Sequence, residues 1–368
     1  MLSGIMAQRD VLAEFTDLVC KQNVAVPVAA MHALVMTIAD SEAQTWMELK
    51  MELDTTIARL QRCGHHNLGG RTNLSLKSGC ALFMQHVMRA FDVMMESKDF
   101  PACRAELARR GNNFTGYSRA SRANIAEIGH SFVQDNSTVL VHGNSRVVSE
   151  LLLKAAESKK FRIIMTESRP NDVHIDSEPE TETESVRKMG RCGGRFSNGG
   201  GGEDGGEDTA VFASSQSALQ FAQAGIPTTV VLDCSVGAIM DQVDLCLVGA
   251  EGVMESGGIV NKVGTYTIAM VAKTLKKPFY VAVESYKFAR LYPLRQSDIT
   301  DNFRNDADDG GASSTAAIEA KMPKHENIKF LHTSVDYTPA EYITLLFTDL
   351  GVLTPAAVSD ELIKLYHQ

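Results

Sequence analysis

Three groups of polar residues in the second half of the chain have the types and spacing needed to bind or activate a ligand. The densest lies in the expected loop Gly249–Thr265 (GAEGVMESGGIVNKVGT) and contains Glu251, Asn261, Lys262 and Thr265. A carboxylate base beside a cation that stabilises negative charge suits proton abstraction. Without a reacting group, the same set forms a cradle for an anionic ligand. The spacing matches neither the Walker A pattern nor GxGxxG.

The second group ends one apolar run and begins a predicted helix. Its members are His142, Gly143, Asn144 and Ser145. A helix N-terminus presents free N–H groups and a positive dipole end, which favours anions, although Ser145 would equally serve as a plain helix cap. The third group, Thr166–Pro170, holds Arg169, which either contacts a phosphate or pairs with Glu167.

Each group follows a short apolar run that is typical of a buried parallel strand. The expected strands are Thr138–His142, Phe161–Thr166, Thr228–Leu232, Leu245–Val248 and Phe279–Val283. Helical patterns alternate with them, at Ser145–Ser158, Ser214–Ala224 and Thr265–Leu275. This alternation predicts βαβ units and a Rossmann-like α/β fold with a parallel sheet, in which ligands bind at the carboxyl ends of the strands.

The first third of the chain has apolar residues at helical spacing and no strong strand signal before Ser137. The sequence therefore predicts an N-terminal helical domain over residues 1–135 and a Rossmann-like α/β domain over residues 136–368. Two segments, at about 171–208 and 306–324, are rich in Gly, Ser and acidic residues and are predicted to be disordered insertions. The acidic run in the first is either a docking segment or a solvated loop.

Charge and cysteine usage limit the class of protein. The 368 residues carry a formal net charge of −9, which argues against a general nucleic-acid binder. Seven scattered cysteines form no CxxC pair, which predicts free thiols in a reducing compartment and no metal site. Cys234, after a strand, is expected to be a buried and inert thiol. No run of 18 apolar residues exists, so the expected location is the cytoplasm and no membrane contact is expected.

An ordered series of segments from about Asn113 onward resembles the alpha-type regulatory subunits of eukaryotic translation initiation factor 2B. The segments are NFTGYSRASRANIAEIGHSF, TVLVHGNSRVV, TESRP, GIPTTVVLDCSVGAIM, VDLCLVGAEGVMESGGIVNKVGTY, KPFYVAVESYKFARLYP and LLFTDLGVLTPAAVSDELIKLY. The closing segment, Leu345–Tyr366, is the most specific, because it resembles the alpha type rather than its beta and delta relatives. The N-terminal helical part contains one further segment, SLKSGCALF, that is compatible with this resemblance.

The resemblance implies a regulatory, non-catalytic role in the complex that reloads initiation factor 2 with GTP. It implies a homodimer that bridges two halves of that complex, contacts with the beta and delta subunits, and sensing of the phosphorylated alpha subunit of initiation factor 2. It implies no required cofactor and no direct contact with nucleic acid. Arg119 and Arg122 are candidates for the contact with the phosphorylated partner, with ordinary solvated arginines as the alternative.

The wider superfamily contains sugar-phosphate isomerases that act on ribose 1,5-bisphosphate and methylthioribose 1-phosphate and share the Asn-Lys-x-Gly-Thr segment. The resemblance implies a cysteine after the first strand and an aspartate in a Gly-Ala-Asp triplet, where this chain has Gly143 and Glu251. A glycine supplies no acid or nucleophile, and moving a carboxylate by about 1 Å costs roughly 100-fold in rate. We therefore expect no catalytic residues, and a pocket that holds a sugar phosphate, a nucleotide monophosphate or another anion. Isomerase activity is the alternative.

Overall fold

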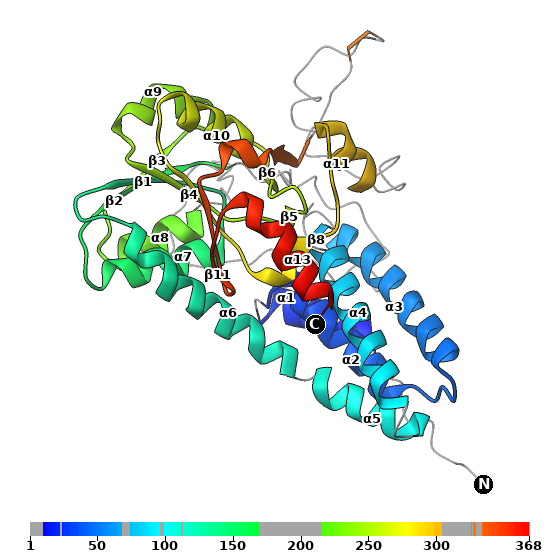
Figure 1. Ribbon diagram of the computed structural model, residues 1–368. Helices are drawn as coiled ribbons and strands as arrows, with labels where there is room; N and C mark the ends of the chain where they lie inside the picture. The colour runs from blue at the N-terminus through cyan, green and yellow to red at the C-terminus, as the bar shows by residue number, and fades with distance from the viewer. Residues whose placement is uncertain are drawn as a thin grey trace, which may run out of the picture.

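The structure is a computed structural model in which a group of helices lies beside a layered α/β part (Figure 1). It describes residues 10–22, 24–67, 74–95, 99–111, 113–168, 215–303, 325, 327–328 and 333–367. The two predicted insertions, at 171–208 and 306–324, lie outside the described residues.

The described N-terminal part is helical, as its apolar periodicity predicted. Its helices are α1 (Val11–Cys20), α2 (Val26–Asp40), α3 (Trp46–Asn67), α4 (Leu74–Met95), α5 (Phe100–Gly111) and α6 (Asn113–Gly129). Pro27 lies in the first turn of α2, where its missing N–H removes no intrahelical hydrogen bond. Because α2 packs against each of the other five, its buried face forms the centre of one hydrophobic core, together with residues such as Leu49 and Phe83.

The C-terminal part contains a seven-stranded sheet with the strand order β11-β10-β7-β4-β1-β2-β3. Its strands are β1 (Thr138–His142), β2 (Arg162–Thr166), β3 (Thr228–Val231), β4 (Leu245–Val248), β7 (Phe279–Ala282), β10 (Leu345–Thr348) and β11 (Gly351–Leu353). Neighbouring strands pair in parallel except β10 and β11. The five predicted strands are confirmed, and β10 and β11 extend the sheet.

Helices cover both faces of this sheet, which confirms the three-layer α/β arrangement (Figure 1). One face carries α6, α7 (Arg146–Ala156) and α8 (Ser215–Gln223), and the other carries α9 (Val236–Ile239), α10 (Thr265–Thr274) and α13 (Val358–His367). Successive strand residues alternate between the two layers: Val139 and Val141 pack on the first, and Leu140 packs on the second.

A second, four-stranded sheet was not predicted. Its strands are β5 (Gly252–Met254), β6 (Ile259–Lys262), β8 (Phe288–Ala289) and β9 (Val335–Thr338), in the order β8-β5-β6-β9. The expected loop Gly249–Thr265 is therefore a β-hairpin that leads into α10. Gly257 turns this hairpin with φ +81°, and a Cβ at Gly257 would lie 2.1 Å from the carbonyl oxygen of Pro355. Glycine is required there by both backbone angle and space.

The helical part and the α/β part are packed together at several places, two of them within hydrophobic cores. Tyr286, in the short turn η4 (Ser285–Lys287), is buried in the hydrophobic core of the helical part. Conversely, Ile125 and Ala126 of α6 belong to the core under the seven-stranded sheet. The boundary between residues 135 and 136 stays a prediction, since α6 contributes to the packing on its C-terminal side.

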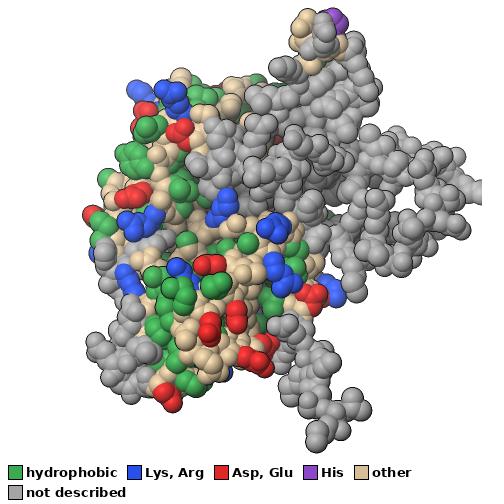
Figure 2. All heavy atoms as spheres, turned by 90° about the vertical axis from the view of Figure 1, so that its right-hand side faces the viewer, with side chains coloured by type: hydrophobic (Ala, Val, Ile, Leu, Met, Phe, Trp, Pro, Cys, Tyr) green, Lys and Arg blue, Asp and Glu red, His purple; other side chains and the backbone are tan. Residues whose placement is uncertain are grey.

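The surface on the side that lies to the right in Figure 1 carries both signs of charge. Figure 2 shows this face, where Lys and Arg side chains are interspersed with Asp and Glu and with hydrophobic side chains. This mixture agrees with the modest negative charge of the whole chain.

Candidate functional site

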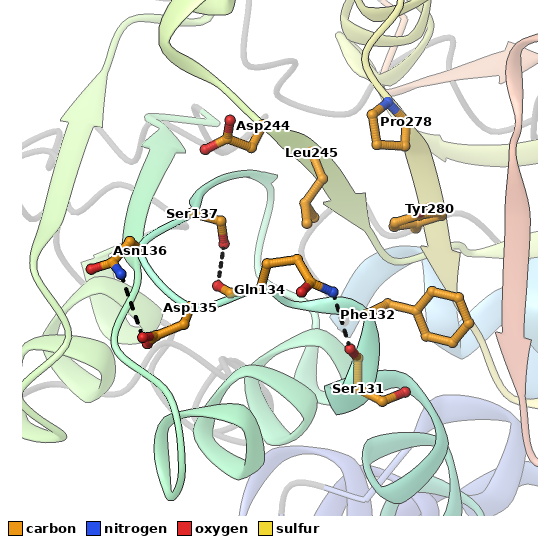
Figure 3. A pocket seen from close by; sticks show the side chains of 10 residues that line it. All are labelled: Ser131, Phe132, Gln134, Asp135, Asn136, Ser137, Asp244, Leu245, Pro278 and Tyr280. Carbon is orange, nitrogen blue, oxygen red and sulfur yellow. Dashed lines mark hydrogen bonds between the residues drawn. The ribbon is translucent and has the colours of Figure 1, made fainter.

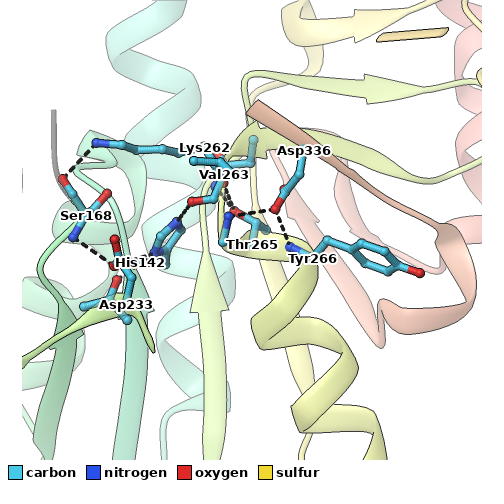
Figure 4. A network of polar contacts seen from close by, with 11 residues as sticks. His142, Ser168, Asp233, Lys262, Val263, Thr265, Tyr266 and Asp336 are labelled. Carbon is cyan, nitrogen blue, oxygen red and sulfur yellow. Dashed lines mark hydrogen bonds and ion pairs between the residues drawn. The ribbon is translucent and has the colours of Figure 1, made fainter. Parts of the chain in front are cut away.

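Side chains from four segments meet at the carboxyl ends of the strands, where the sequence predicted a ligand site (Figure 4). His142 ends β1, Ser168 follows β2, Asp233 follows β3 in the turn η2 (Asp233–Ser235), and Lys262 ends β6. The parallel register of β1, β2 and β3 brings their carboxyl ends to the same edge of the sheet. We call these four residues the strand-end cluster.

His142 is buried, and both of its ring nitrogens are occupied. Nε2 lies 3.0 Å from the carbonyl oxygen of Val263, which only accepts, so Nε2 carries the proton. Nδ1 then accepts a hydrogen bond from the Thr166 hydroxyl at 2.6 Å and lies 3.9 Å from Oδ1 of Asp233. Burial lowers the pKa of His142 despite the nearby carboxylate, so the imidazole is neutral at pH 7. His142 therefore orders the end of β1 and presents no positive charge.

Lys262 is the cation of the strand-end cluster. Its Nζ donates a hydrogen bond to the carbonyl oxygen of Ser168 at 2.9 Å. Burial lowers the pKa of Lys262, and the carboxylates of Asp233 and Glu251 oppose that shift. One ammonium beside two carboxylates suits a ligand that carries hydroxyls, which donate to carboxylate oxygens, together with an anionic group, which accepts from the ammonium. Glu251, which the sequence grouped with Lys262, thus acts on the pKa of that lysine electrostatically, and Asp233 is an addition.

Ser168 and Gly143 face each other across the cluster. Ser168 has φ +47°, and its backbone N–H donates to Oδ1 of Asp233 at 3.0 Å. Its hydroxyl oxygen is buried and has no hydrogen-bond partner among the described residues. A Cβ at Gly143 would lie 3.7 Å from this oxygen, so there is room for a small side chain, but the φ of +74° favours glycine.

Asn144 and Ser145, the two predicted residues after Gly143, form hydrogen bonds to the neighbouring helices α8 and α7. The Ser145 hydroxyl oxygen accepts from the backbone N–H of Val148 at 3.5 Å and caps α7, as the plain-cap alternative proposed. Asn144 Oδ1 accepts a hydrogen bond of 2.8 Å from the hydroxyl of Ser217 in α8. Both side chains thus bind protein groups at the rim of the strand-end cluster.

The N-terminus of α10 is occupied by a residue that the sequence analysis missed. Oδ2 of Asp336, in β9, accepts from the backbone N–H groups of Gly264 at 2.7 Å and Tyr266 at 3.0 Å (Figure 4). Burial raises the pKa of Asp336 to about 6, against the effect of these hydrogen bonds. Because a carboxylate already satisfies this helix end, α10 does not offer it to an anionic ligand. No local pattern marks Asp336, which lies 72 residues after Gly264.

Asn261 and Thr265 close the turn between β6 and α10. The Asn261 side-chain amide donates to the Thr265 hydroxyl oxygen at 3.0 Å, and this hydroxyl donates to the carbonyl oxygen of Lys262 at 2.6 Å. Thr265 is fully buried. The two side chains therefore hold the backbone of Lys262 in place.

The predicted arginines are not part of this cluster as described. Arg169 lies outside the described residues, and so does the side chain of Arg119. Arg122, in α6, places its Nε 3.6 Å from a carboxylate oxygen of Glu150 in α7, and 17% of its side chain is exposed. In the described structure Arg122 links two helices.

Comparison with known proteins identifies the family. The model of the initiation factor 2 subunit family matches residues 21–173 and 212–355. The chain belongs to this family.

Relatives in and around the family carry two kinds of name. The chain is 37% identical over 370 residues to translation initiation factor eIF2B subunit alpha of Dictyostelium discoideum, with 100% of both chains covered. It is 26% identical to a ribose 1,5-bisphosphate isomerase of Archaeoglobus fulgidus, over 74% of this chain and 70% of the relative. A crystal structure of the tetrameric eIF2B-beta2-delta2 complex from C. thermophilum has the same fold, with a TM-score of 0.66 and 16% identity over 98% of this chain and 96% of that chain.

Of the five cysteines whose side chains are described, Cys80, Cys103 and Cys246 are buried. Burial raises the pKa of Cys80 and of Cys246 to about 12, so neither is a thiolate at neutral pH. Cys234 is exposed, contrary to the expectation of a buried thiol. In the described ranges, no three or more His, Cys, Asp or Glu residues are placed to hold a metal ion. Within the same ranges, no helix combines the length and apolar character needed to cross a membrane.

A cavity of about 610 Å³ lies at the opposite, amino-terminal edge of the sheet (Figure 3). It lies between the loop before β1 and the starts of β4 and β7, and none of the predicted site residues lines it. Asp244 in its wall accepts from the backbone N–H of Thr138 at 2.7 Å, and Asp135 accepts from that of Lys160 at 2.7 Å. These carboxylates tie the strand starts together, and the strand-end cluster stays the candidate site.

Proposed function

We propose that the chain is a regulatory, non-catalytic subunit of the guanine-nucleotide exchange factor for translation initiation factor 2, acting in the cytoplasm. It forms a homodimer that bridges the complex, binds the beta and delta subunits, and senses the phosphorylated alpha subunit of initiation factor 2. The observation that carries this proposal is the similarity to eIF2B subunit alpha over the whole length of both chains. The beta–delta complex supports it through the shared fold.

Assembly is tested with the tagged chain co-expressed with the beta and delta subunits. Both subunits are expected to copurify with it, and light scattering of the isolated chain is expected to give twice its mass of 40.0 kDa. A strict monomer at micromolar concentration, or failure to retain either subunit, contradicts the proposal.

The absence of isomerase chemistry is the second part of the proposal. Support comes from Gly143, whose left-handed backbone favours glycine where the resemblance implies a cysteine, and from Glu251 in place of an aspartate. Incubation with ribose 1,5-bisphosphate or methylthioribose 1-phosphate is expected to give no turnover. Turnover that Glu251→Gln abolishes would establish the isomerase alternative instead.

The strand-end cluster is proposed to hold a sugar phosphate, a nucleotide monophosphate or a related anion as a regulatory ligand. The buried, unpartnered hydroxyl of Ser168 and the partly buried Lys262 support this, since both are positioned to bind polar ligand groups. Calorimetry with a panel of phosphorylated metabolites is expected to show binding that Lys262→Ala removes and Lys273→Ala, at an exposed lysine, retains. If the wild type binds no member at millimolar concentration, the ligand proposal is wrong.

The phospho-sensing contact is proposed to involve the arginines of α6. A phosphate would have to compete with Glu150 for Arg122, so Arg119→Glu is the sharper variant. It is expected to leave assembly intact and to weaken the response of nucleotide exchange to phosphorylated initiation factor 2. An unchanged response places the sensing surface elsewhere.

A further inference from the structure

Among the described residues, no strand pairs with the outer edge of β3, and β3 carries no charge. β3 is the last strand of the seven-stranded sheet and pairs with β2 on one side. Together with α8 and the intervening turn it spans Ser215–Leu232, 18 residues without a single Asp, Glu, Lys, Arg or His. Because 22% of the whole chain is charged, about four charged residues are expected in a stretch of this length (22% of 18).

Much of this uncharged stretch faces solvent. The exposed fractions of Leu219, Val230 and Leu232 are 60%, 49% and 49%. α8 packs beside β3, so Leu219 belongs to the same side of the molecule. Depletion of charge together with exposed apolar side chains is characteristic of the centre of a protein–protein interface.

The backbone of β3 is also available for pairing. The carbonyl oxygens of Pro227 and Val231 accept hydrogen bonds from the β2 side. In a parallel pair, both backbone groups of one residue point to the same side and successive residues alternate. Val230 therefore directs its N–H and its C=O outward, at the centre of the open edge.

The opposite edge of the same sheet is built differently. α6 packs against β11, the outermost strand there. Natural sheets protect exposed edges with charges or covering elements, and β11 follows this rule. The edge at β3 has no charge between Ser215 and Leu232, which is expected where another strand covers it.

We propose that β3 and α8 form the contact between the two copies in the homodimer, with the two β3 strands pairing antiparallel about Val230. That a homodimer exists is taken from the proposed function; the inference assigns the surface through which the two copies touch. A two-fold axis brings each residue close to its own copy, so an uncharged surface meets itself without like-charge repulsion. In an antiparallel pair, a residue opposite itself exchanges two N–H···O bonds, which the outward groups of Val230 allow.

The test places charges at the axis. Val230→Lys and Val230→Asp each bring two like charges together in a homodimer, and each is expected to raise the dimer dissociation constant at least roughly 100-fold. Mixing the two variants is expected to restore a dimer that contains one copy of each, detected by native mass spectrometry. This rescue requires that Val230 of one copy contacts Val230 of the other copy. Since Val230 is half exposed, both variants are expected to keep the circular dichroism of the wild type.

The matched control is Val352→Lys on β11, which changes the same residue type on the other edge strand at 40% exposure. This variant is expected to dimerise like the wild type. Single variants that remain dimeric, or a mixture that fails to associate, place the dimer contact elsewhere while the homodimer stands. If Val230→Lys still dimerises but no longer binds the beta and delta subunits, the surface contacts those subunits instead, and the inference is wrong. A monomeric wild type overturns both proposals.

Discussion

Two partly buried polar clusters lie at the same edge of the seven-stranded sheet and differ in how their charged groups are paired. The strand-end cluster surrounds Lys262 and leaves the hydroxyl of Ser168 without a partner among the described residues. The second, which we call the junction cluster, consists of Glu284, Tyr286, Lys287, Ser285 and Asp349, after β7 and β10.

The junction cluster links the helical part to the sheet, and its charged side chains form an ion pair with each other. Lys287 Nζ lies 3.0 Å from a carboxylate oxygen of Glu284 and donates to the carbonyl oxygen of Ala250 at 3.0 Å. The Tyr286 hydroxyl donates to the other Glu284 oxygen at 3.0 Å, while its ring packs in the helical core. Burial opposes ionisation of Glu284, but Lys287 and these hydrogen bonds outweigh it and hold the pKa of Glu284 below its usual value.

The comparison teaches that burial of polar groups alone does not identify a binding site. In the junction cluster the charges are paired with each other, so the cluster stabilises the fold. In the strand-end cluster one ammonium faces two carboxylates, and a buried hydroxyl is free to bind. Substitutions in the first are therefore expected to change stability, and substitutions in the second to change ligand binding.

Lys287→Met is expected to have the largest effect on stability. It leaves the Glu284 carboxylate buried and unpaired, which costs about 3–5 kcal/mol in the free energy of unfolding. Urea denaturation followed by circular dichroism measures this change. Lys273→Met removes a shorter but exposed ion pair, to Glu341, and is expected to cost less than about 1 kcal/mol.

The same comparison predicts a partial rescue. Adding Glu284→Gln to Lys287→Met removes the buried charge, so the double variant is expected to be more stable than Lys287→Met alone. If the double variant lost as much free energy of unfolding as the two single variants together, Glu284 and Lys287 would not be energetically coupled.

An intermediate effect is expected at Asp336, which borders the strand-end cluster. Its pKa is raised to about 6 in the folded chain, from 3.8, so its protonated form favours folding. The stabilisation is complete below pH 3.8 and is lost as the pH rises through 6. Between pH 5 and 7.5 the wild type is expected to lose about 1 kcal/mol relative to Asp336→Asn.

Urea denaturation at the two pH values measures this difference for the Asp336 variant. Asp54→Asn, at an exposed acid on α3, serves as the control for the loss of one charge. Parallel pH dependence of the wild type and Asp336→Asn would mean that the carboxyl of Asp336 titrates alike in the folded and unfolded chain.

The smallest effect on stability is expected for Lys262→Met. Removing the ammonium also removes the unfavourable burial that lowers its pKa, so the free energy of unfolding is expected to change by less than about 1 kcal/mol. Ligand binding, in contrast, is expected to be lost. If Lys262→Met lost as much stability as Lys287→Met, the strand-end cluster would also stabilise the fold, and the two clusters would not differ in role.

The main sheet was predictable from sequence because its strands are buried on both faces. Runs such as Thr138–His142 and Leu245–Val248 are continuous in apolar residues, and the polar groups after them mark the edge where ligands bind. Lys262 was found because it lies in the polar segment between such a strand and a predicted helix, although the strand β6 that carries it was not predicted.

The second sheet and the complete site were not predictable by the same reasoning. The strands β5 (GVM) and β9 (VDYT) are three and four residues long, and β9 pairs with β6 across a large gap in sequence, with Thr338 opposite Ile259. Such strands are defined by their partners and carry little local signal. Asp336 was missed for the same reason, since its role depends on groups that only the folded chain brings near. Asp233 directly follows the predicted strand Thr228–Leu232, so its place at a strand end was available from the sequence.

The capping of α10 by Asp336 has a consequence for the order in which a newly made chain matures. Synthesis proceeds from the N-terminus, so the helical part and β1 through β8 leave the ribosome before β9 does. Until Asp336 arrives, the first N–H groups of α10 have water as their partner, and the hairpin that carries Lys262 lacks its neighbour β9. The candidate site is thereby completed late in translation, so a nascent chain that stops before residue 336 would carry most of the sheet without a finished site.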